Sequence, residues 1–214
     1  MSIPKVIVQT SRNLPYEYVV NMIRNKSPGW DYQHFTDNDV IQFFINNPID
    51  ELPDVIQKFY SFSYGEHRAD LFRYYYLYVK GGVYMDTDAM LEDNIENIVQ
   101  DYEFFSVNST YFPGTIFQGF IGCTPKHPIL YEALKDLYFI DNQLLITQFH
   151  TLCKNMYDMV AAHKNKYPDS NVKLYQEVYG TPEEAHCIDV ERNNQLVLIH
   201  YHIKKIIPPR NSFC

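Results

Sequence analysis

The 214-residue sequence has few cysteines and no pairing pattern among them. Cys123, Cys153, Cys187 and Cys214 stand far apart, and none belongs to a C-x-x-C pair. This spacing excludes a zinc finger and a disulfide scaffold, so we expect reduced thiols. The sequence also lacks any run near the ~20 apolar residues of a membrane span. Its first residues lack the basic and apolar regions of a signal peptide. We therefore expect a soluble, cytoplasmic protein.

Basic residues are also scarce. Lys and Arg number 18 against 26 Asp and Glu, which gives a formal net charge of −8. This balance repels the phosphate backbone, so we expect no nucleic-acid partner. Tryptophan occurs once, whereas tyrosine occurs 19 times and phenylalanine 14 times. Tyrosine in this quantity fills a core or lines a pocket, and composition does not distinguish the two.

Strand and helix patterns alternate along the chain, which predicts an α/β protein with ligands at the carboxyl ends of its strands. The expected strands are 5–9, 30–35, 82–85, 103–107, 116–122 and 196–201. The expected helices are 15–26, 40–45 with Asp37 as N-cap, 66–80, 127–138 and 142–163. In the last of these helices, Phe149, Leu152, Met156 and Met159 are interpreted as core rather than as an acceptor site.

Two carboxylates, Asp86 and Asp88, follow a predicted strand and carry the first chemical signal. At a strand end both can turn toward one divalent cation, and oxygen ligands suit Mg²⁺ or Mn²⁺. An EF-hand loop is excluded because Leu91 and Asn97 occupy the positions that require Gly and Glu. A dehalogenase-type phosphatase, with Asp86 as nucleophile and Asp88 as acid and base, stays open as an alternative, although Met90 departs from its pattern.

The helix before this strand contains a charged pair. Asp70 and Arg73 are three residues apart and therefore share one helix face. They lie in the most apolar helix of the chain, where burying charge without a purpose is costly. Gly81 and Gly82 allow a sharp turn from helix to strand. We expect this turn to bring the pair beside the D-x-D carboxylates.

Residues 69–88, which contain these features, resemble the sugar-binding signature of the DXD glycosyltransferases. The family is glycosyltransferase family 32, of the yeast outer-chain mannosyltransferase type, related to the large bacterial glucosylating toxins. Weaker similarity flanks this stretch in the same order, at 3–10, 28–37 and 118–128. Two positions depart from the family pattern, with Val8 where histidine is usual and Gln118 where asparagine is expected.

The resemblance implies a GT-A type nucleotide-binding fold, with a mixed central sheet flanked by helices. It implies one domain over 1–214, with 200–214 as a mobile tail over the donor site. The implied activity is metal-dependent transfer of a hexose from a nucleotide sugar to a glycan or other acceptor, with retention of configuration. A UDP-sugar is favoured and GDP-mannose is second. A non-catalytic sugar-nucleotide-binding protein is a further alternative, and the chain is compatible with one domain of a larger protein.

The resemblance also implies roles for individual residues. The implied catalytic residues are Asp70, Arg73 and Asp86. The implied donor-binding residues are Val8, Gln9, Thr10, Asp70, Arg73, Tyr84, Asp86, Lys204 and Lys205. The implied ligands of Mn²⁺ or Mg²⁺ are Asp86, Asp88 and His200, with His202 as the alternative histidine. The histidines treated as ordinary surface or core residues are His67, His127, His150 and His163.

Overall fold

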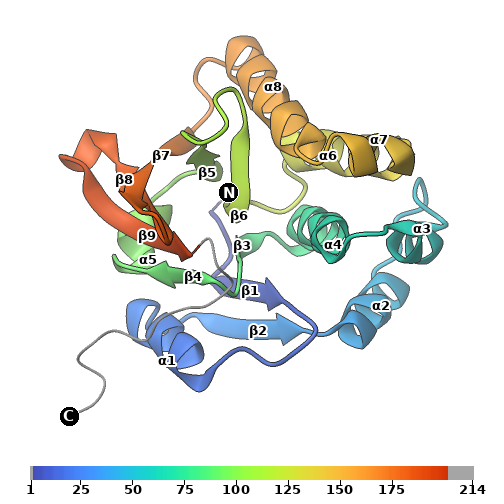
Figure 1. Ribbon diagram of the computed structural model, residues 1–214, viewed down its shortest axis with the longest axis horizontal. Helices are drawn as coiled ribbons and strands as arrows, with labels where there is room; N and C mark the ends of the chain where they lie inside the picture. The colour runs from blue at the N-terminus through green and yellow to red at the C-terminus, as the bar shows by residue number, and fades with distance from the viewer. Residues whose placement is uncertain (1, 202–214) are drawn as a thin grey trace.

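The computed structural model describes residues 2–201, which form a curled mixed sheet with helices on both faces (Figure 1). The strands are β1 (Val6–Thr10), β2 (Asp31–Phe35), β3 (Gly82–Met85), β4 (Ala89–Leu91), β5 (Phe104–Asn108), β6 (Ile116–Cys123), β7 (Val172–Thr181), β8 (Glu184–Asp189) and β9 (Gln195–Tyr201). Within the described residues their order is β2-β1-β3-β6-β5-β7-β8-β9-β4. Parallel pairs join β1 to β2 and β3, and β5 to β7, whereas the other neighbours are antiparallel. The predicted mixed α/β fold is confirmed.

The helices divide between the two faces of the sheet (Figure 1). They are α1 (Glu17–Lys26), α2 (Asp37–Asn46), α3 (Val55–Ser61), α4 (Gly65–Lys80), α5 (Ile95–Val99), α6 (Pro128–Phe139), α7 (Asn142–Thr147) and α8 (Thr151–Lys166). One apolar core lies between the sheet and α2, α3, α4, α6 and α8. A second core joins α1 and α5 to the opposite face and to β4.

The turn between α4 and β3 confirms the role expected of its two glycines. Gly81 and Gly82 have φ values of +69° and +107°, which side chains with a Cβ rarely adopt. A Cβ at Gly82 would also lie 2.5 Å from Cγ1 of Val6. The tight turn therefore lets β3 pair directly with β1, so that the ends of both strands open on one side of the sheet.

Two of the sequence-based boundaries need correction. The expected helix 142–163 is two helices, because the backbone leaves the helical conformation at Gln148, the C-cap of the first, with φ −130° and ψ 72°. Phe149 lies in the break and is 41% exposed, so its interpretation as core is wrong. In addition, the N-cap of α2 is Thr36 rather than Asp37, because Thr36 forms a capping box with Asp39.

The expected strand 196–201 corresponds to β9, which pairs with the short strand β4. Ala89 lies opposite His200 in this ladder. Because β4 begins directly after the D-x-D segment, the pairing brings Tyr201, 113 positions later in the sequence, beside Asp88. The backbone N–H of Tyr201 donates a hydrogen bond to the Asp88 carbonyl at 3.0 Å.

Candidate active site

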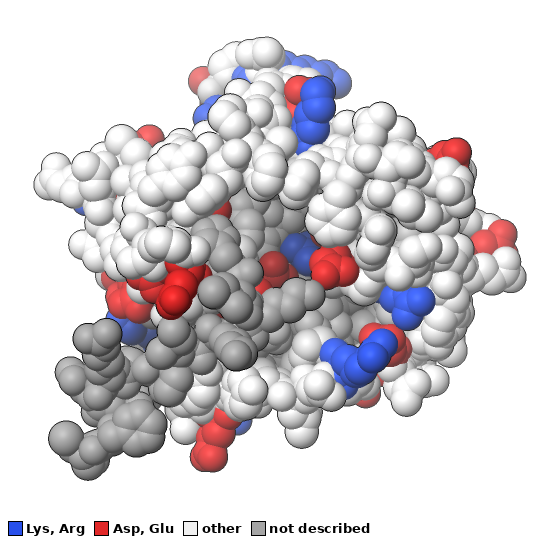
Figure 2. All heavy atoms as spheres, in the orientation of Figure 1, with Lys and Arg blue, Asp and Glu red and all other residues white. Residues whose placement is uncertain are grey.

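A cleft of about 850 Å³ opens where β1 and β3 end. The loop after β1 forms one wall, the first half of α4 forms another, and the segment after β3 forms the floor. Figure 2 shows a hollow in this face of the molecule, with acidic and basic side chains together inside it. The charged residues of the lining are Arg12, Asp37, Glu66, Arg68, Arg73, Asp86 and Asp88.

Arg73 is the central cation of the cleft and is only 5% exposed. Its Nε lies 3.5 Å from Oδ1 of Asp70, and its Nη2 lies 3.4 Å from Oδ1 of Asp86. Its Nη1 donates a 2.5 Å hydrogen bond to the carbonyl of Gln118. Burial alone would lower the pKa of Arg73, but Tyr84 and the carboxylates of Asp86 and Asp70 raise it above its ordinary value, so the guanidinium stays charged. The expected juxtaposition of Asp70, Arg73 and Asp86 is therefore present.

Tyr84 contacts both the guanidinium of Arg73 and the carboxylate of Asp86. Its ring lies under the guanidinium of Arg73, with 4.4 Å from Cζ to the ring centroid. Its hydroxyl donates a 2.9 Å hydrogen bond to Oδ1 of Asp86. Burial raises the pKa of Tyr84 well above its ordinary value, and the nearby carboxylate of Asp86 adds to the shift. Tyr84 therefore remains a neutral donor that fixes the rotamer of Asp86.

The main chain and the packing around Asp86 are also fixed. The side-chain amide of Gln9 donates to the carbonyl of Asp86 at 3.1 Å, and the backbone N–H of Asp86 donates to the carbonyl of Gly119 at 2.8 Å. A Cβ at Gly119 would lie 2.4 Å from Oδ2 of Asp86. The space that this carboxylate occupies exists because position 119 carries no side chain.

Asp88 and His200 face each other across the β4–β9 pair. Nε2 of His200 lies 3.7 Å from Oδ1 of Asp88, and the imidazole packs on the ring of Phe117 with 4.4 Å between centroids. Both side chains are partly exposed, at 26% for Asp88 and 18% for His200. A carboxylate and an imidazole therefore lie side by side, and their role as ligands of a divalent cation stays a prediction.

This pair fits a divalent cation of the Mg²⁺ or Mn²⁺ type. Such ions are commonly held by one or two carboxylates, with substrate phosphates and water completing the shell, and imidazole suits Mn²⁺. Within residues 2–201 no three His, Cys, Asp or Glu side chains lie together as a complete cage. Asp86 is instead turned toward Tyr84 and Arg73. Asp88 and His200 would therefore hold such a cation only with further ligands from water or a bound substrate.

The sequence analysis missed the histidine that supports Asp70. Nδ1 of His67 lies 3.3 Å from Oδ2 of Asp70, and His67 is 2% exposed, so it is a core histidine with an acidic partner. The spacing of three residues on a predicted helix was a usable signal, as it was for Asp70 and Arg73. Asp70 itself is 13% exposed and lies between these two partners.

Among the other predicted donor-binding residues that the structure describes, one lines the cleft and two do not. Of Val8, Gln9 and Thr10, only Thr10 lines the cleft, while Val8 and Gln9 are fully buried. Lys204 and Lys205, like His202, lie outside the described residues. The sequence analysis also missed Arg12 and Arg68, although the position of Arg12 just after the first strand was a usable signal.

These features define a class: a mixed α/β sheet that presents a D-x-D segment at a strand end, in the manner of GT-A glycosyltransferases. Residues 16–105 match the family described as the glycosyltransferase sugar-binding region containing DXD motif. This match confirms, for this part of the chain, the resemblance that was stated from the sequence.

Three comparisons place the chain among known proteins. An inositol phosphoceramide mannosyltransferase of Schizosaccharomyces pombe is 31% identical over 142 residues, covering 63% of this chain and 43% of the relative. An uncharacterized glycosyltransferase of Acanthamoeba polyphaga mimivirus is 25% identical over 149 residues, covering 69% and 59%. The chain thus spans about half the length of these curated relatives. The solved PaToxG glycosyltransferase shares the fold, with a TM-score of 0.50 and 13% identity over 78% of this chain and 70% of that one.

The helices between residues 2 and 201 include none with the length and apolar character needed to cross a membrane.

Proposed function

We propose that this protein transfers a hexose from a nucleotide sugar to an acceptor, with a divalent cation held at Asp88 and His200. The observation that carries the proposal is the buried Arg73, which lines a cleft of about 850 Å³ together with Asp86 and Asp88 and contacts both Asp86 and Asp70. A polar floor with a fixed arginine and carboxylates suits a sugar and a diphosphate better than an apolar ligand.

In the proposed reaction, the described residues hold the donor rather than form a bond to it. Asp86 accepts hydrogen bonds from donor hydroxyls, since its carboxylate is fixed by Tyr84 and Arg73 and its main chain by Gln9. When bound, the cation supplies charge stabilisation for the departing nucleoside diphosphate. The negative charges of Asp70 and Asp86 favour the oxocarbenium-like state of the sugar.

The stereochemical outcome that we propose is retention through front-face displacement. The two carboxylates that contact Arg73 are those of Asp86 and Asp70. This engagement supports a role in binding and orientation rather than in a covalent intermediate. We further propose that the described residues act as a single domain, since one continuous sheet connects them.

Calorimetric titration with UDP-, GDP- and dTDP-sugars, with and without Mn²⁺, tests the proposal. A UDP-hexose is the first donor to test, and GDP-mannose the second, because the fission-yeast relative is named a mannosyltransferase. We expect Mn²⁺ to strengthen donor binding roughly tenfold or more in the native chain and not in Asp88→Ala. Asp101→Ala, which alters an exposed carboxylate outside the cleft, is the matched control.

Other outcomes would support the alternatives. Trapping of beryllium fluoride at Asp86, without binding of any nucleotide sugar, would support the dehalogenase-type phosphatase. Donor binding without hydrolysis or transfer to any acceptor would support a non-catalytic sugar-nucleotide-binding protein. Metal-stimulated turnover that survives Asp88→Ala would overturn the proposed cation site.

A further inference from the structure

Three half-exposed aromatic side chains gather beside the cleft, although they come from three separate segments. Tyr64 precedes α4 and is 40% exposed, Phe149 lies between α7 and α8 and is 41% exposed, and Phe112 lies in the β5–β6 loop and is 50% exposed. We call these three residues, together with His150 between them, the aromatic shelf.

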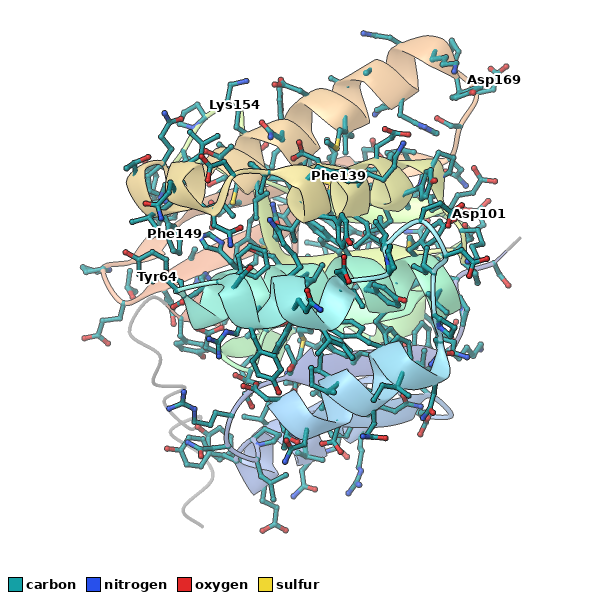
Figure 3. All side chains as sticks on the ribbon, turned by 90° about the vertical axis from the view of Figure 1, so that its right-hand side faces the viewer. Tyr64, Asp101, Phe139, Phe149, Lys154 and Asp169 are labelled. Carbon is teal, nitrogen blue, oxygen red and sulfur yellow. The ribbon has the colours of Figure 1, made fainter. Side chains whose placement is uncertain are left out.

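Ring contacts connect the members of the aromatic shelf into one surface. The ring centroids of Tyr64 and Phe149 are 5.7 Å apart, and their planes meet at 78°. The ring of Phe149 lies 5.4 Å from that of His150, which packs on Phe112 at 4.1 Å. Figure 3 shows Tyr64 and Phe149 together at one edge of the molecule, on the side where the cleft opens. The surface is bent rather than flat, because the ring planes of Tyr64 and Phe149 are nearly perpendicular.

The aromatic shelf is continuous with the cleft through α4. Tyr64 directly precedes Gly65 and Glu66, which line the cleft. Beneath the shelf, the ring of His67 lies 5.8 Å from Tyr64 and 4.9 Å from Phe149, and Nδ1 of His67 contacts Asp70 at 3.3 Å. His67 and Asp70 therefore connect the shelf to Arg73, which lines the proposed donor site.

The chemistry of this surface points to a sugar ring. Exposed aromatic faces next to a polar cleft are costly in water, and such patches commonly mark binding sites. The face of an aromatic ring is electron-rich and packs against the C–H face of a pyranose, while nearby polar groups bind its hydroxyls. His150 and Glu66 stand at the shelf and at the cleft wall as such groups.

We propose that the aromatic shelf binds the acceptor, and that the acceptor presents a sugar ring there. This inference rests on the proposed function, because it assigns the donor to the cleft and the acceptor to the adjoining surface. The shelf then sets the position of the acceptor hydroxyl relative to the donor held at Asp86.

Saturation-transfer NMR and steady-state kinetics with methyl α-D-mannopyranoside and methyl α-D-glucopyranoside test the assignment. We expect Phe149→Ala to weaken glycoside binding roughly fivefold or more, with a similar rise in acceptor KM and less than a twofold change in donor KM. We expect Phe112→Ala also to weaken glycoside binding and to raise the acceptor KM. Because Phe112 packs on His150 rather than on His67, this variant separates loss of the shelf from a disturbance of the buried His67. The matched control is Phe139→Ala, an exposed phenylalanine at the end of α6 that is 72% accessible and lies on another face (Figure 3).

The outcomes separate this inference from the proposed function. Glycoside binding that is equal in the native chain, Phe149→Ala and Phe112→Ala would overturn the shelf assignment even if donor turnover is normal. Loss of binding to phosphatidylcholine–phosphatidylserine vesicles in the shelf variants, with glycoside binding unchanged, would also overturn it in favour of a lipid surface. A native chain that binds no nucleotide sugar would contradict the proposed function, while the NMR measurement would still report on the shelf.

Discussion

The guanidinium of Arg73 and the carboxylate of Asp86 lie 3.4 Å apart, between Nη2 and Oδ1, at the floor of the cleft. The contact joins the middle of α4 to the segment after β3, and Arg73 is almost completely buried. A buried cation with two carboxylate partners is both a structural support and the positive centre of the proposed donor site.

Arg73→Lys should therefore reduce both the stability of the fold and the activity with the donor. Lysine lacks the planar fork that reaches Asp70, Asp86 and the Gln118 carbonyl together. We expect a loss of roughly 100-fold in kcat/KM for the donor and a loss of about 3 kcal/mol in the free energy of unfolding. Urea denaturation and donor kinetics measure the two effects. Arg24→Lys on the exposed side of α1 is the control, and a donor kcat/KM at the native level in Arg73→Lys would contradict the prediction.

Gly119→Ala should separate activity from stability. The new Cβ would lie 2.4 Å from Oδ2 of Asp86 and 2.3 Å from Cζ of Phe117, and both atoms are the ends of side chains that can rotate away. We expect the fold to persist, while the displaced carboxylate weakens donor binding roughly tenfold. Calorimetry with the donor and a thermal melt give the comparison. Gly65→Ala, which adds a methyl group to open space, is the stability control.

The helix–turn–strand unit that carries Arg73 and Asp86 was predictable because every signal for it is local. Period-3.6 apolar positions, two glycines and the D-x-D segment follow each other within residues 66–88. The structure shows α4, the turn and β3 in that order. The mixed sheet was implied by the resemblance and is confirmed by the strand order.

The features that the sequence did not predict depend on contacts between distant segments or on short elements. β4 has three residues and gains its strand identity only by pairing with β9. Phe149 has the spacing of a core residue on a continuous helix, but the backbone leaves the helical conformation at Gln148. The spacing of His67 and Asp70 indicates a contact on one helix face, but only the structure shows that His67 is buried there.

Two lysines with similar ion-pair distances should differ greatly in their effect on stability. Nζ of Lys173 lies 2.7 Å from Asp189, and both side chains are buried, at 6% and 1% exposure. Nζ of Lys154 lies 2.6 Å from Asp158, and both are exposed, at 64% and 59%. We expect Lys173→Met to cost about 3 kcal/mol, because Asp189 loses a partner while buried, and Lys154→Met to cost less than about 0.5 kcal/mol.

Chemical denaturation of both variants at the same pH makes this comparison. Arg192 also contacts Asp189 at 2.7 Å and is retained in Lys173→Met, so the variant is expected to fold. Equal losses in the two variants would show that the buried network around Asp189 does not stabilise the β7–β8–β9 sheet as we infer.

Acid should destabilise the protein through His127, which begins α6. Burial lowers the pKa of His127 from 6.5 to about 4, and the neighbouring His163 adds to the shift. Nδ1 of His127 accepts a hydrogen bond from the backbone N–H of Ile129 at 3.3 Å, so the cap also requires a neutral ring. In the unfolded chain the imidazole takes up a proton near pH 6.5, whereas the folded chain resists until about pH 4.

The sign of the effect follows from this difference. The unfolded state binds more protons than the folded state between these two pKa values, so the stabilisation is complete above pH 6.5 and is lost as the pH falls toward 4. The maximum loss is about 3 kcal/mol. His127→Asn keeps a side-chain acceptor at the cap but cannot titrate. Urea unfolding at several pH values between 7.5 and 4.5 measures the free energy of unfolding. This free energy should therefore depend less steeply on pH in His127→Asn than in the native chain. The same pH dependence in both proteins would show that the acid sensitivity arises from another residue.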